Sequence, residues 1–491
     1  MSEQWTALKE RIGEIEALMG AMGILEWDQQ VMMPRGGAAS RGAQLSALSG
    51  VFHGRLTDPV LGELAAGLLD DPDPTTAAAA ANILRKHQRA ARVPASLAKA
   101  FASAASEGFA AWMAAREARA FEPFQPALQR LVDLARESGA CQGPAEHPYD
   151  NLLEEFDPGS TTADVTAMFS RLATELSAFV RSLDGKPAPE EVKIPCPEAE
   201  TIAISRHIAT ALGYRFEDGR LDISQHPFTV GMHPGDVRIT THPYPENLSN
   251  ALWGTIHETG HALYEQGLPL ALAGTGLCSA ASTGMHESQS RFWENFIARS
   301  QPFITWLTPL LREHLPGVAI DPVALYRSAN RVTPSLIRIH ADEATYNLHI
   351  LIRFELETAL IKGDLAVGDL PGAWDDAYER LLGVRASHLN EGVLQDVHWS
   401  GGMFGYFPSY TMGNLYAASL AAAIQQDLPD LWQRVGAGDF APILGWLREK
   451  VHSRGHTVEA PQILADATGG RDPVADFMAH LRGRQGVVYG G

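Results

Sequence analysis

The residues with the clearest chemical potential form the pattern His257-Glu258-x-x-His261. Histidines four positions apart lie on one face of an α-helix, about 6 Å apart along its axis. Both imidazoles can therefore bind one metal ion. Glu258 is adjacent to that face, where its carboxylate can serve as general base toward a metal-bound water. Apolar residues on both sides of the pattern indicate burial, and buried imidazoles need polar partners.

A catalytic zinc site uses three protein ligands and keeps one position open, so a third ligand is expected. Glu265 is a poor candidate, because it lies one turn beyond His261 and would place three ligands in a line. The third ligand should come from a later helix. The segment 284–295 supplies His286, Glu287 and Glu294. On the residues alone, both Glu287 and Glu294 are candidates.

Other polar clusters stand in apolar surroundings, and each has an ordinary structural explanation. Asp236 and Arg238 could form a surface ion pair on a strand. Arg338 and Asp342 have the i,i+4 spacing of a helix salt bridge. The glycine-rich and aromatic run 401–414 could be loop packing.

Helical patterns dominate the elements that must position these residues. Residues 6–22 carry apolar positions at spacings of three and four, which is typical of an amphipathic helix. The alanine-rich stretch 76–140 predicts closely packed helices. A further helix is predicted from about 164 to 183, with Thr161 or Thr162 as its N-cap.

Strand signals are confined to one place. Residues 228–230 and 237–241 are β-formers that flank a glycine-containing turn, which predicts a small hairpin or a sheet of two to three strands. Four prolines in 186–198 indicate a linker. From Leu248 onward the helical patterns resume.

The chain has 491 residues, of which 45% are hydrophobic and 20% charged. We interpret it as one large domain (1–491), with a mostly helical N-terminal lobe (1–190) and a catalytic region (191–491). The net charge of −19 argues against nucleic-acid binding. The sequence contains no run of about 18 apolar residues, so no membrane span is predicted. Three scattered cysteines and the absence of an apolar signal core predict a cytoplasmic location.

Six motifs occur together, and with the early run 25–34 they resemble the carboxypeptidase Taq family, the M32 metallocarboxypeptidases. The resemblance covers almost the whole chain. In chain order the motifs are His226-Pro227-Phe228, Asp236-x-Arg238-x-Thr240, His257-Glu258-x-x-His261, His286-Glu287-Ser288-Gln289-Ser290-Arg291, Ile337-Arg338-x-x-Ala341-Asp342 and Gly392-x-x-Gln395-Asp396-x-His398-Trp399.

The resemblance implies a mainly α, two-lobed fold with a deep central groove and a small sheet, similar to neurolysin and angiotensin-converting enzyme. It also implies a homodimer that removes single residues from the C-termini of peptides, with broad specificity and poor release of proline. The implied cofactor is Zn²⁺, with Co²⁺ as a possible substitute.

The resemblance also implies roles for individual residues. The metal ligands of the family correspond to His257, His261 and Glu287, and its general base corresponds to Glu258. The wider group of helical zinc peptidases carries His-x-x-Gly-Gly followed by a tyrosine. By that pattern, His398 and Tyr410 are the residues that donate hydrogen bonds to the oxyanion.

Tyr406 is the rival of Tyr410 for the oxyanion role. An exopeptidase must also recognise a free carboxylate, and the planar fork of an arginine suits this task. Arg338 is the first candidate and Arg238 the second. His226 and Arg238 are expected to line the groove wall or limit peptide length, and Gln395 to assist there.

Two alternatives remain at this stage. One is a dipeptidase or oligoendopeptidase of the same fold. The other is a non-catalytic helical scaffold that binds peptides and has a degraded or structural metal site. Metal analysis, and the products released from a peptide mixture, distinguish these alternatives from a carboxypeptidase.

Overall fold

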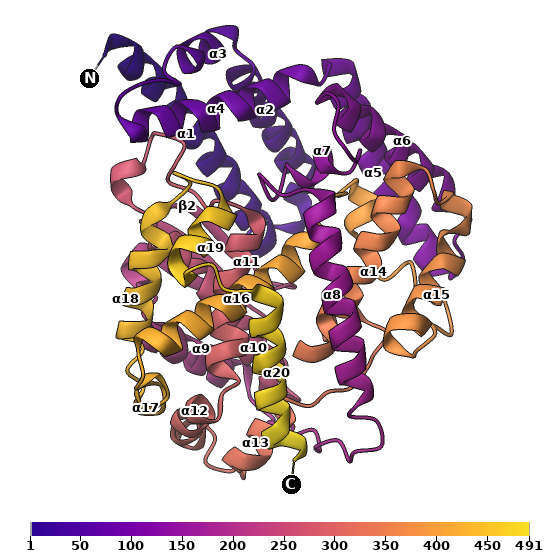
Figure 1. Cartoon of the computed structure of the whole chain (residues 1–491), viewed down its shortest axis with the longest axis vertical. Helices are drawn as coiled ribbons and strands as arrows, with labels where there is room; N and C mark the ends of the chain where they lie inside the picture. The colour runs from indigo at the N-terminus through magenta and orange to yellow at the C-terminus, as the bar shows by residue number, and fades with distance from the viewer. Residues whose placement is uncertain (1, 491) are drawn as a thin grey trace.

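The computed structural model describes residues 2–490, and helices form nearly all of it (Figure 1). The α-helices are Glu3–Val31 (α1), Ala38–Leu56 (α2), Pro59–Ala66 (α3), Pro74–Arg92 (α4), Ala95–Ala118 (α5), Gln125–Cys141 (α6), Asp150–Leu153 (α7), Thr162–Arg181 (α8), Glu198–Leu212 (α9), Leu248–Glu265 (α10), Thr283–Arg291 (α11), Gln301–His314 (α12), Pro322–Ala329 (α13), Glu343–Lys362 (α14), Leu370–Leu382 (α15), Phe407–Asp427 (α16), Leu431–Ala437 (α17), Ala441–Lys450 (α18), Ala460–Thr468 (α19) and Pro473–Tyr489 (α20). The prediction of a mainly α fold is confirmed.

The predicted helix over 6–22 is part of the longer helix α1. Ser2 caps α1, because its hydroxyl accepts a hydrogen bond from the Trp5 N–H. Leu8, Ile12 and Ile15 are buried in a small core that α1 shares with α3 and α4. The first proline after residue 5 is Pro34, so the helix continues through Trp27 into the early family-like run.

The helix predicted over 164–183 is α8, and Thr161 caps it by accepting a hydrogen bond from the Asp164 N–H. Residues 186–197 then form neither helix nor strand, as their prolines predict. In Figure 1, α8 runs down the molecule between α20 on one side and α14 and α15 on the other.

The predicted hairpin is present and has a third strand. Strand β2 (Thr229–His233) pairs antiparallel with β3 (Asp236–Thr241), with an irregularity between Gly231 and His233. Strand β1 (Gly219–Ile223) pairs parallel with β3, which gives the order β1-β3-β2. Strands β2 and β3 pack against α10, and this contact positions the sheet beside the His-Glu-x-x-His pattern.

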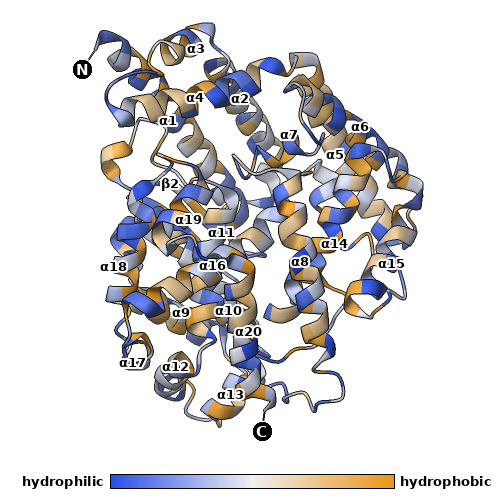
Figure 2. Ribbon diagram, in the orientation of Figure 1, coloured by the Kyte–Doolittle hydropathy of each residue, from blue (hydrophilic) through white to orange (hydrophobic). Residues whose placement is uncertain are grey.

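Helix α16 forms the centre of the main core. It packs against α11, α14, α19 and α20, and its residues from Phe407 to Leu420 are almost all buried. Outer helices such as α8 and α15 carry both hydrophilic and hydrophobic residues, as the mixed colours in Figure 2 show. No helix within residues 2–490 combines the length and apolar character that a membrane span requires.

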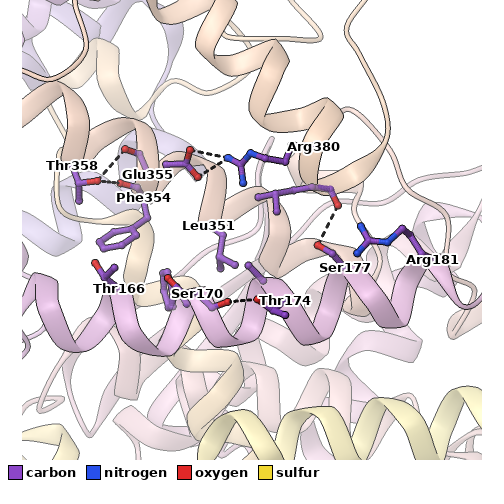
Figure 3. Close-up of a pocket in the computed structure, with 13 residues that line it drawn as sticks. Thr166, Ser170, Thr174, Ser177, Arg181, Leu351, Phe354, Glu355, Thr358 and Arg380 are labelled. Carbon is purple, nitrogen blue, oxygen red and sulfur yellow. Dashed lines mark hydrogen bonds and ion pairs between the residues drawn. The ribbon is translucent and has the colours of Figure 1, made fainter.

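A pocket of about 620 Å³ lies between α8, α14 and α15 (Figure 3). Hydroxyl side chains of α8, including Thr166 and Ser170, line one wall, and Leu351 and Phe354 of α14 line the other. None of the residues that the sequence singles out for chemistry lines this pocket. The candidate site therefore lies elsewhere.

Candidate active site

Helix α10 carries the predicted metal-binding pair. Asn247 caps the helix by accepting a hydrogen bond from the Ser249 N–H, and the sequence then continues without proline to Glu265. The rings of His257 and His261 lie on one face, with their centroids 4.9 Å apart. The four-residue spacing therefore places both imidazoles on one face of the helix, as predicted.

Helix α11 brings a carboxylate to this pair. The Glu287 Oε2 lies 3.5 Å from His257 Nε2 and 3.3 Å from His261 Nε2. The three side chains offer one ligand atom each, all within 4.8 Å of one another. Glu265 points elsewhere, because its Oε1 accepts a hydrogen bond from His286 Nε2 at 2.9 Å.

Two glycines allow α11 to approach so closely. A Cβ at Gly260 of α10 would lie 2.6 Å from the Ser290 Cα and 2.7 Å from the Gln289 backbone oxygen of α11. A Cβ at Gly413 of α16 would lie 2.6 Å from the Glu287 Cγ. Helix α11 is therefore held between two helices at backbone contact distance.

Glu294, the other carboxylate that the sequence left open, occupies a second layer. It lies in a π-helical segment, Phe292–Ala298 (η4), that continues from α11. Its Oε2 accepts a hydrogen bond from His257 Nδ1 at 3.0 Å. Arg291 and Arg299 also bind it. Glu294 thus orients the His257 ring so that its Nε2 faces Glu287, as outer carboxylates do in metal sites.

The charges of the cluster fit a divalent cation. Burial lowers the pKa of His261 to about 3, so this imidazole is neutral. Burial opposes ionisation of Glu287, but Arg291 and the histidines hold its pKa well below the usual value. Arg291 binds Glu287 Oε1 at 2.7 Å, which leaves Oε2 for a metal. Two imidazole nitrogens and one carboxylate oxygen form a donor set that zinc prefers in catalytic sites.

The pKa of His257 is raised, although burial alone would lower it, because the Glu287 and Glu294 carboxylates favour the protonated ring. A cation bound between the rings would replace that proton, since metal ligation requires the neutral imidazole. The three side chains therefore fit a metal ion in arrangement and in charge.

Glu258 lies beside the cluster on α10. It is buried, and burial raises its pKa. Its Oε2 accepts a hydrogen bond from the Thr229 hydroxyl at 2.7 Å. Thr229 belongs to β2, so the sheet orients this carboxylate. Thr229 was not among the predicted site residues, although its position in the β-forming segment next to the His-Pro-Phe motif was a usable signal.

His398 and the two candidate tyrosines form one aromatic group. His398 begins a short 3-10 helix, His398–Gly401 (η7), and Tyr410 lies in the first turn of α16. The His398 Nε2 and Tyr410 Oη are 3.4 Å apart. The Tyr406 and Tyr410 rings are 5.2 Å apart. Both tyrosines have pKa values raised chiefly by burial and further by the Glu287 charge, so both keep their hydroxyl protons.

Arg338 is buried and binds a different acid from the one that the i,i+4 spacing suggested. Its Nε and Nη2 donate to Asp396 Oδ1 at 3.0 and 2.8 Å. Arg353 of α14 donates to the other oxygen of Asp396 at 2.6 Å. The alternative of a helix salt bridge to Asp342 is wrong, because Arg338 precedes α14 in a 3-10 turn and Asp342 caps that helix.

The other residues predicted to bind substrate either make contacts within the chain or are exposed. Arg238 forms the expected ion pair with Asp236 at 2.8 Å, but it is half-buried against the Trp27 ring of α1 and does not lie on the open surface. Gln395 uses its amide within the chain, since it accepts from the Arg338 N–H and donates to backbone oxygens such as that of Leu336. His226 is exposed before β2.

Comparisons with known proteins agree with these features. The sequence model described as carboxypeptidase Taq (M32) metallopeptidase matches residues 7–485. The chain is 38% identical to thermostable carboxypeptidase 1 of Thermus thermophilus, over 96% of this chain and 97% of that protein. It is 36% identical to carboxypeptidase 1 of Bacillus subtilis, over 96% and 95%.

Solved structures show the same likeness. An M32 carboxypeptidase from Deinococcus radiodurans R1 superimposes with a TM-score of 0.96 at 36% identity, over 100% of both chains. A carboxypeptidase from Pyrococcus furiosus gives a TM-score of 0.96 at 34% identity, over 98% of this chain and 99% of that one. Sequence and fold agree along the whole length.

Proposed function

The chain belongs to the carboxypeptidase Taq (M32) family and is a metallocarboxypeptidase, and from this premise we propose that it uses zinc to release single C-terminal residues from peptides. We propose broad specificity and poor release of proline. The convergence of His257, His261 and Glu287 on one point is the observation that carries the proposal.

His257, His261 and Glu287 would hold the ion, with Co²⁺ as a possible substitute. When bound, zinc supplies Lewis acidity toward the peptide carbonyl and lowers the pKa of water toward about 7. Glu294 keeps the His257 ring oriented through its Nδ1. Arg291 keeps Glu287 ionised and occupies only one of its two oxygens.

Glu258 is the proposed general base. Its carboxylate takes a proton from the attacking water and then gives it to the leaving amine. The hydrogen bond from the Thr229 hydroxyl holds the carboxylate in one orientation. Burial raises the pKa of Glu258, which makes it a better proton acceptor than an exposed glutamate.

His398 and Tyr410 are proposed to donate hydrogen bonds to the oxyanion, with Tyr406 as the rival tyrosine. Burial lowers the pKa of His398 to about 4, so the ring is neutral and carries one N–H donor. One such donor is typically worth about 3 kcal/mol of the barrier. The variants Tyr406→Phe and Tyr410→Phe, tested separately, show which hydroxyl acts, because loss of that hydroxyl should lower kcat.

Arg338 is proposed to bind the C-terminal carboxylate of the substrate. Arg338 and Arg353 share the single Asp396 carboxylate, so the buried cluster keeps a net positive charge. That charge would attract the C-terminal carboxylate of the substrate, and hydrogen bonds from the guanidinium groups would replace those from its hydrating waters. Arg238 is the second candidate. His226 and Arg238 are proposed to line the groove wall or limit peptide length, with Gln395 assisting.

The cellular setting is also a proposal. Cys141, Cys196 and Cys278 are free thiols, which suits a reducing cytoplasm. We further propose a homodimer, to be tested by light scattering of the purified protein.

The decisive experiment is mass spectrometry of a mixed peptide digest after incubation with the enzyme. We expect ladders that shorten one residue at a time from the C-terminus, and C-amidated peptides that stay intact. Release of dipeptides or internal cleavage would instead indicate a dipeptidase or oligoendopeptidase. Absence of both metal and hydrolysis would indicate a peptide-binding scaffold.

The variant Glu258→Gln tests the mechanism. It should keep the metal and lose about 10²- to 10⁴-fold in kcat, because the amide cannot accept the proton. Normal turnover by this variant would rule out Glu258 as the base.

A further inference from the structure

Glu357 is a fully buried acid on α14 that the proposed chemistry does not use. Within residues 2–490, no cationic side chain lies within ion-pair distance of its carboxylate. Three hydrogen-bond donors surround it instead. The Trp399 Nε1 donates to Oε1 at 2.6 Å, and the Tyr149 hydroxyl and the Gly405 N–H donate to Oε2 at 2.5 and 3.1 Å.

Two of these donors belong to the segment that carries the proposed oxyanion groups. Trp399 directly follows His398, and Gly405 directly precedes Tyr406. The carboxylate therefore contacts the segment 398–406 near both of its ends. The third donor, Tyr149, is itself fully buried and lies just before the short helix α7. Glu357 thus joins three distant parts of the chain at one point.

Helix α14 also binds the chain just before this segment. Arg353 lies one turn before Glu357 and donates to Asp396, two residues before His398. Residues four apart lie on one helix face, so Arg353 and Glu357 act together toward the segment. Leu351, Phe354, Glu355 and Thr358 lie on another face of α14 and line the separate pocket of Figure 3.

We propose that Glu357 is a positioning residue that fixes the segment 398–406 and so holds His398, Tyr406 and the adjoining Tyr410 in their arrangement for the oxyanion role. The inference rests on the proposed function only for what the held groups do. The anchoring itself follows from the three contacts and from the burial of every partner. Removal of the anchor should affect the reacting state more than substrate binding, because oxyanion donors act mainly in the transition state.

The chemistry of the contacts requires a carboxylate. All three partners are donors, and the ionised side chain, which prevails above a pKa of about 7, offers only acceptors. A glutamine would place an NH₂ group against either the Trp399 indole N–H or the Tyr149 and Gly405 donors. One side of the contact would then be repulsive, and a buried donor would lose its acceptor. The substitution preserves volume, so it changes the hydrogen bonding and the charge without changing the packing.

The test compares Glu357→Gln with Glu355→Gln. Glu355 lies two residues earlier on α14, is 55% exposed and pairs with Arg380, which makes it a matched control on the pocket face. We expect Glu357→Gln to lower kcat at least about 10-fold, because small displacements of catalytic groups are costly. KM should stay within about threefold, and zinc content should equal that of the control, since the metal ligands do not contact Glu357.

Hydrogen–deuterium exchange provides a readout that does not depend on activity. Faster exchange in peptides covering 398–406, with unchanged exchange in α10 and α11, supports the proposal. Unchanged exchange in 398–406, or kinetics equal to those of Glu355→Gln, would overturn it. If the wild type releases no C-terminal residues but exchange still responds to Glu357→Gln, the proposed function fails and the anchoring stands.

Two milder variants cover the case in which Glu357→Gln does not fold. Trp399→Phe and Tyr149→Phe each remove one donor and leave the carboxylate in place. Trp399→Phe removes the donor next to His398, and we expect it to lower kcat more than Tyr149→Phe does. Equal effects of the two variants on stability, with no change of kcat in either, would overturn the positioning role.

Discussion

Replacement of Asp396 by asparagine tests the buried arginine cluster. The Asp396 carboxylate is the shared acceptor of Arg338 and Arg353. Burial opposes its ionisation, yet the two guanidinium groups hold its pKa far below the usual value. Asparagine keeps the shape of the side chain and removes the charge. Two buried cations would then share no anion, since their other partners include only neutral groups such as Tyr346 and Tyr378.

The expected loss can be estimated from the burial. The side chains of Asp396 and Arg338 are 8% exposed, and that of Arg353 is fully buried. Removal of one partner from a buried ion pair costs about 3–5 kcal/mol. For 491 residues the entropy of unfolding is about 1 kcal/mol/K. The melting temperature should therefore fall by about 3–5 °C.

Calorimetry of the metal-loaded enzyme measures this fall. The matched control is Asp430→Asn, which removes the charge from an exposed pair with Arg434 and should leave the melting temperature unchanged. The double variant with Arg353→Met should recover part of the loss, because one buried cation is removed together with the anion. A melting temperature of Asp396→Asn within one degree of the wild type would refute the reasoning, because it would mean a loss of about 1 kcal/mol or less.

Three further predictions follow from the site and its surroundings. Glu294→Gln should weaken zinc affinity about 10- to 100-fold in competition with a chelator, because His257 loses its outer carboxylate; unchanged affinity would contradict the orienting role. Chelation should abolish hydrolysis and lower the melting temperature, with recovery on addition of Zn²⁺ or Co²⁺, because the buried ligands lose their cation; full activity after verified metal removal would contradict a metal mechanism. Burial raises the pKa of Glu357 from its ordinary value of 4.5 to about 7 in the folded state. Hydrogen bonds from its three donors and the charge of Arg353 oppose this rise. The acid is therefore favourable to stability below pH 4.5, and that contribution is lost as the pH rises through 7, so the unfolding free energy of the wild type relative to Glu357→Gln should fall by about 3 kcal/mol across this range; parallel pH curves for the two proteins would contradict it.

The chemistry of the first metal ligands could be predicted because it is local. The four-residue spacing of His257 and His261 requires only that the segment be helical, and the residues around it have no helix breakers. The third ligand was not decided by the residues, because Glu287 and Glu294 lie on one continuous helical stretch. Its packing against α10, together with the π-helical turn, sets which carboxylate meets the imidazoles.

The acids and bases behind the site were harder to predict. Arg353 and Glu357 have the spacing of a surface ion pair, yet each binds a partner from elsewhere in the chain. A usable signal was present, because α14 carries apolar residues on most of its surface, which left few exposed positions for Arg353 and Glu357. Strand β1 was outside the predicted hairpin, since a parallel partner leaves no turn signal in the sequence.

The two glycines that flank α11 have a consequence for how this enzyme can change over time. Gly260 lies against the main chain of α11 and Gly413 against the Glu287 side chain itself, so the distance of Glu287 from the imidazoles is set by these close contacts and not by the side chains of the peptide-binding surface. Mutations that alter which residue is removed can accumulate there while the ion stays bound. A methyl group at either glycine would clash with α11 and displace Glu287, so we expect variation to avoid these two positions.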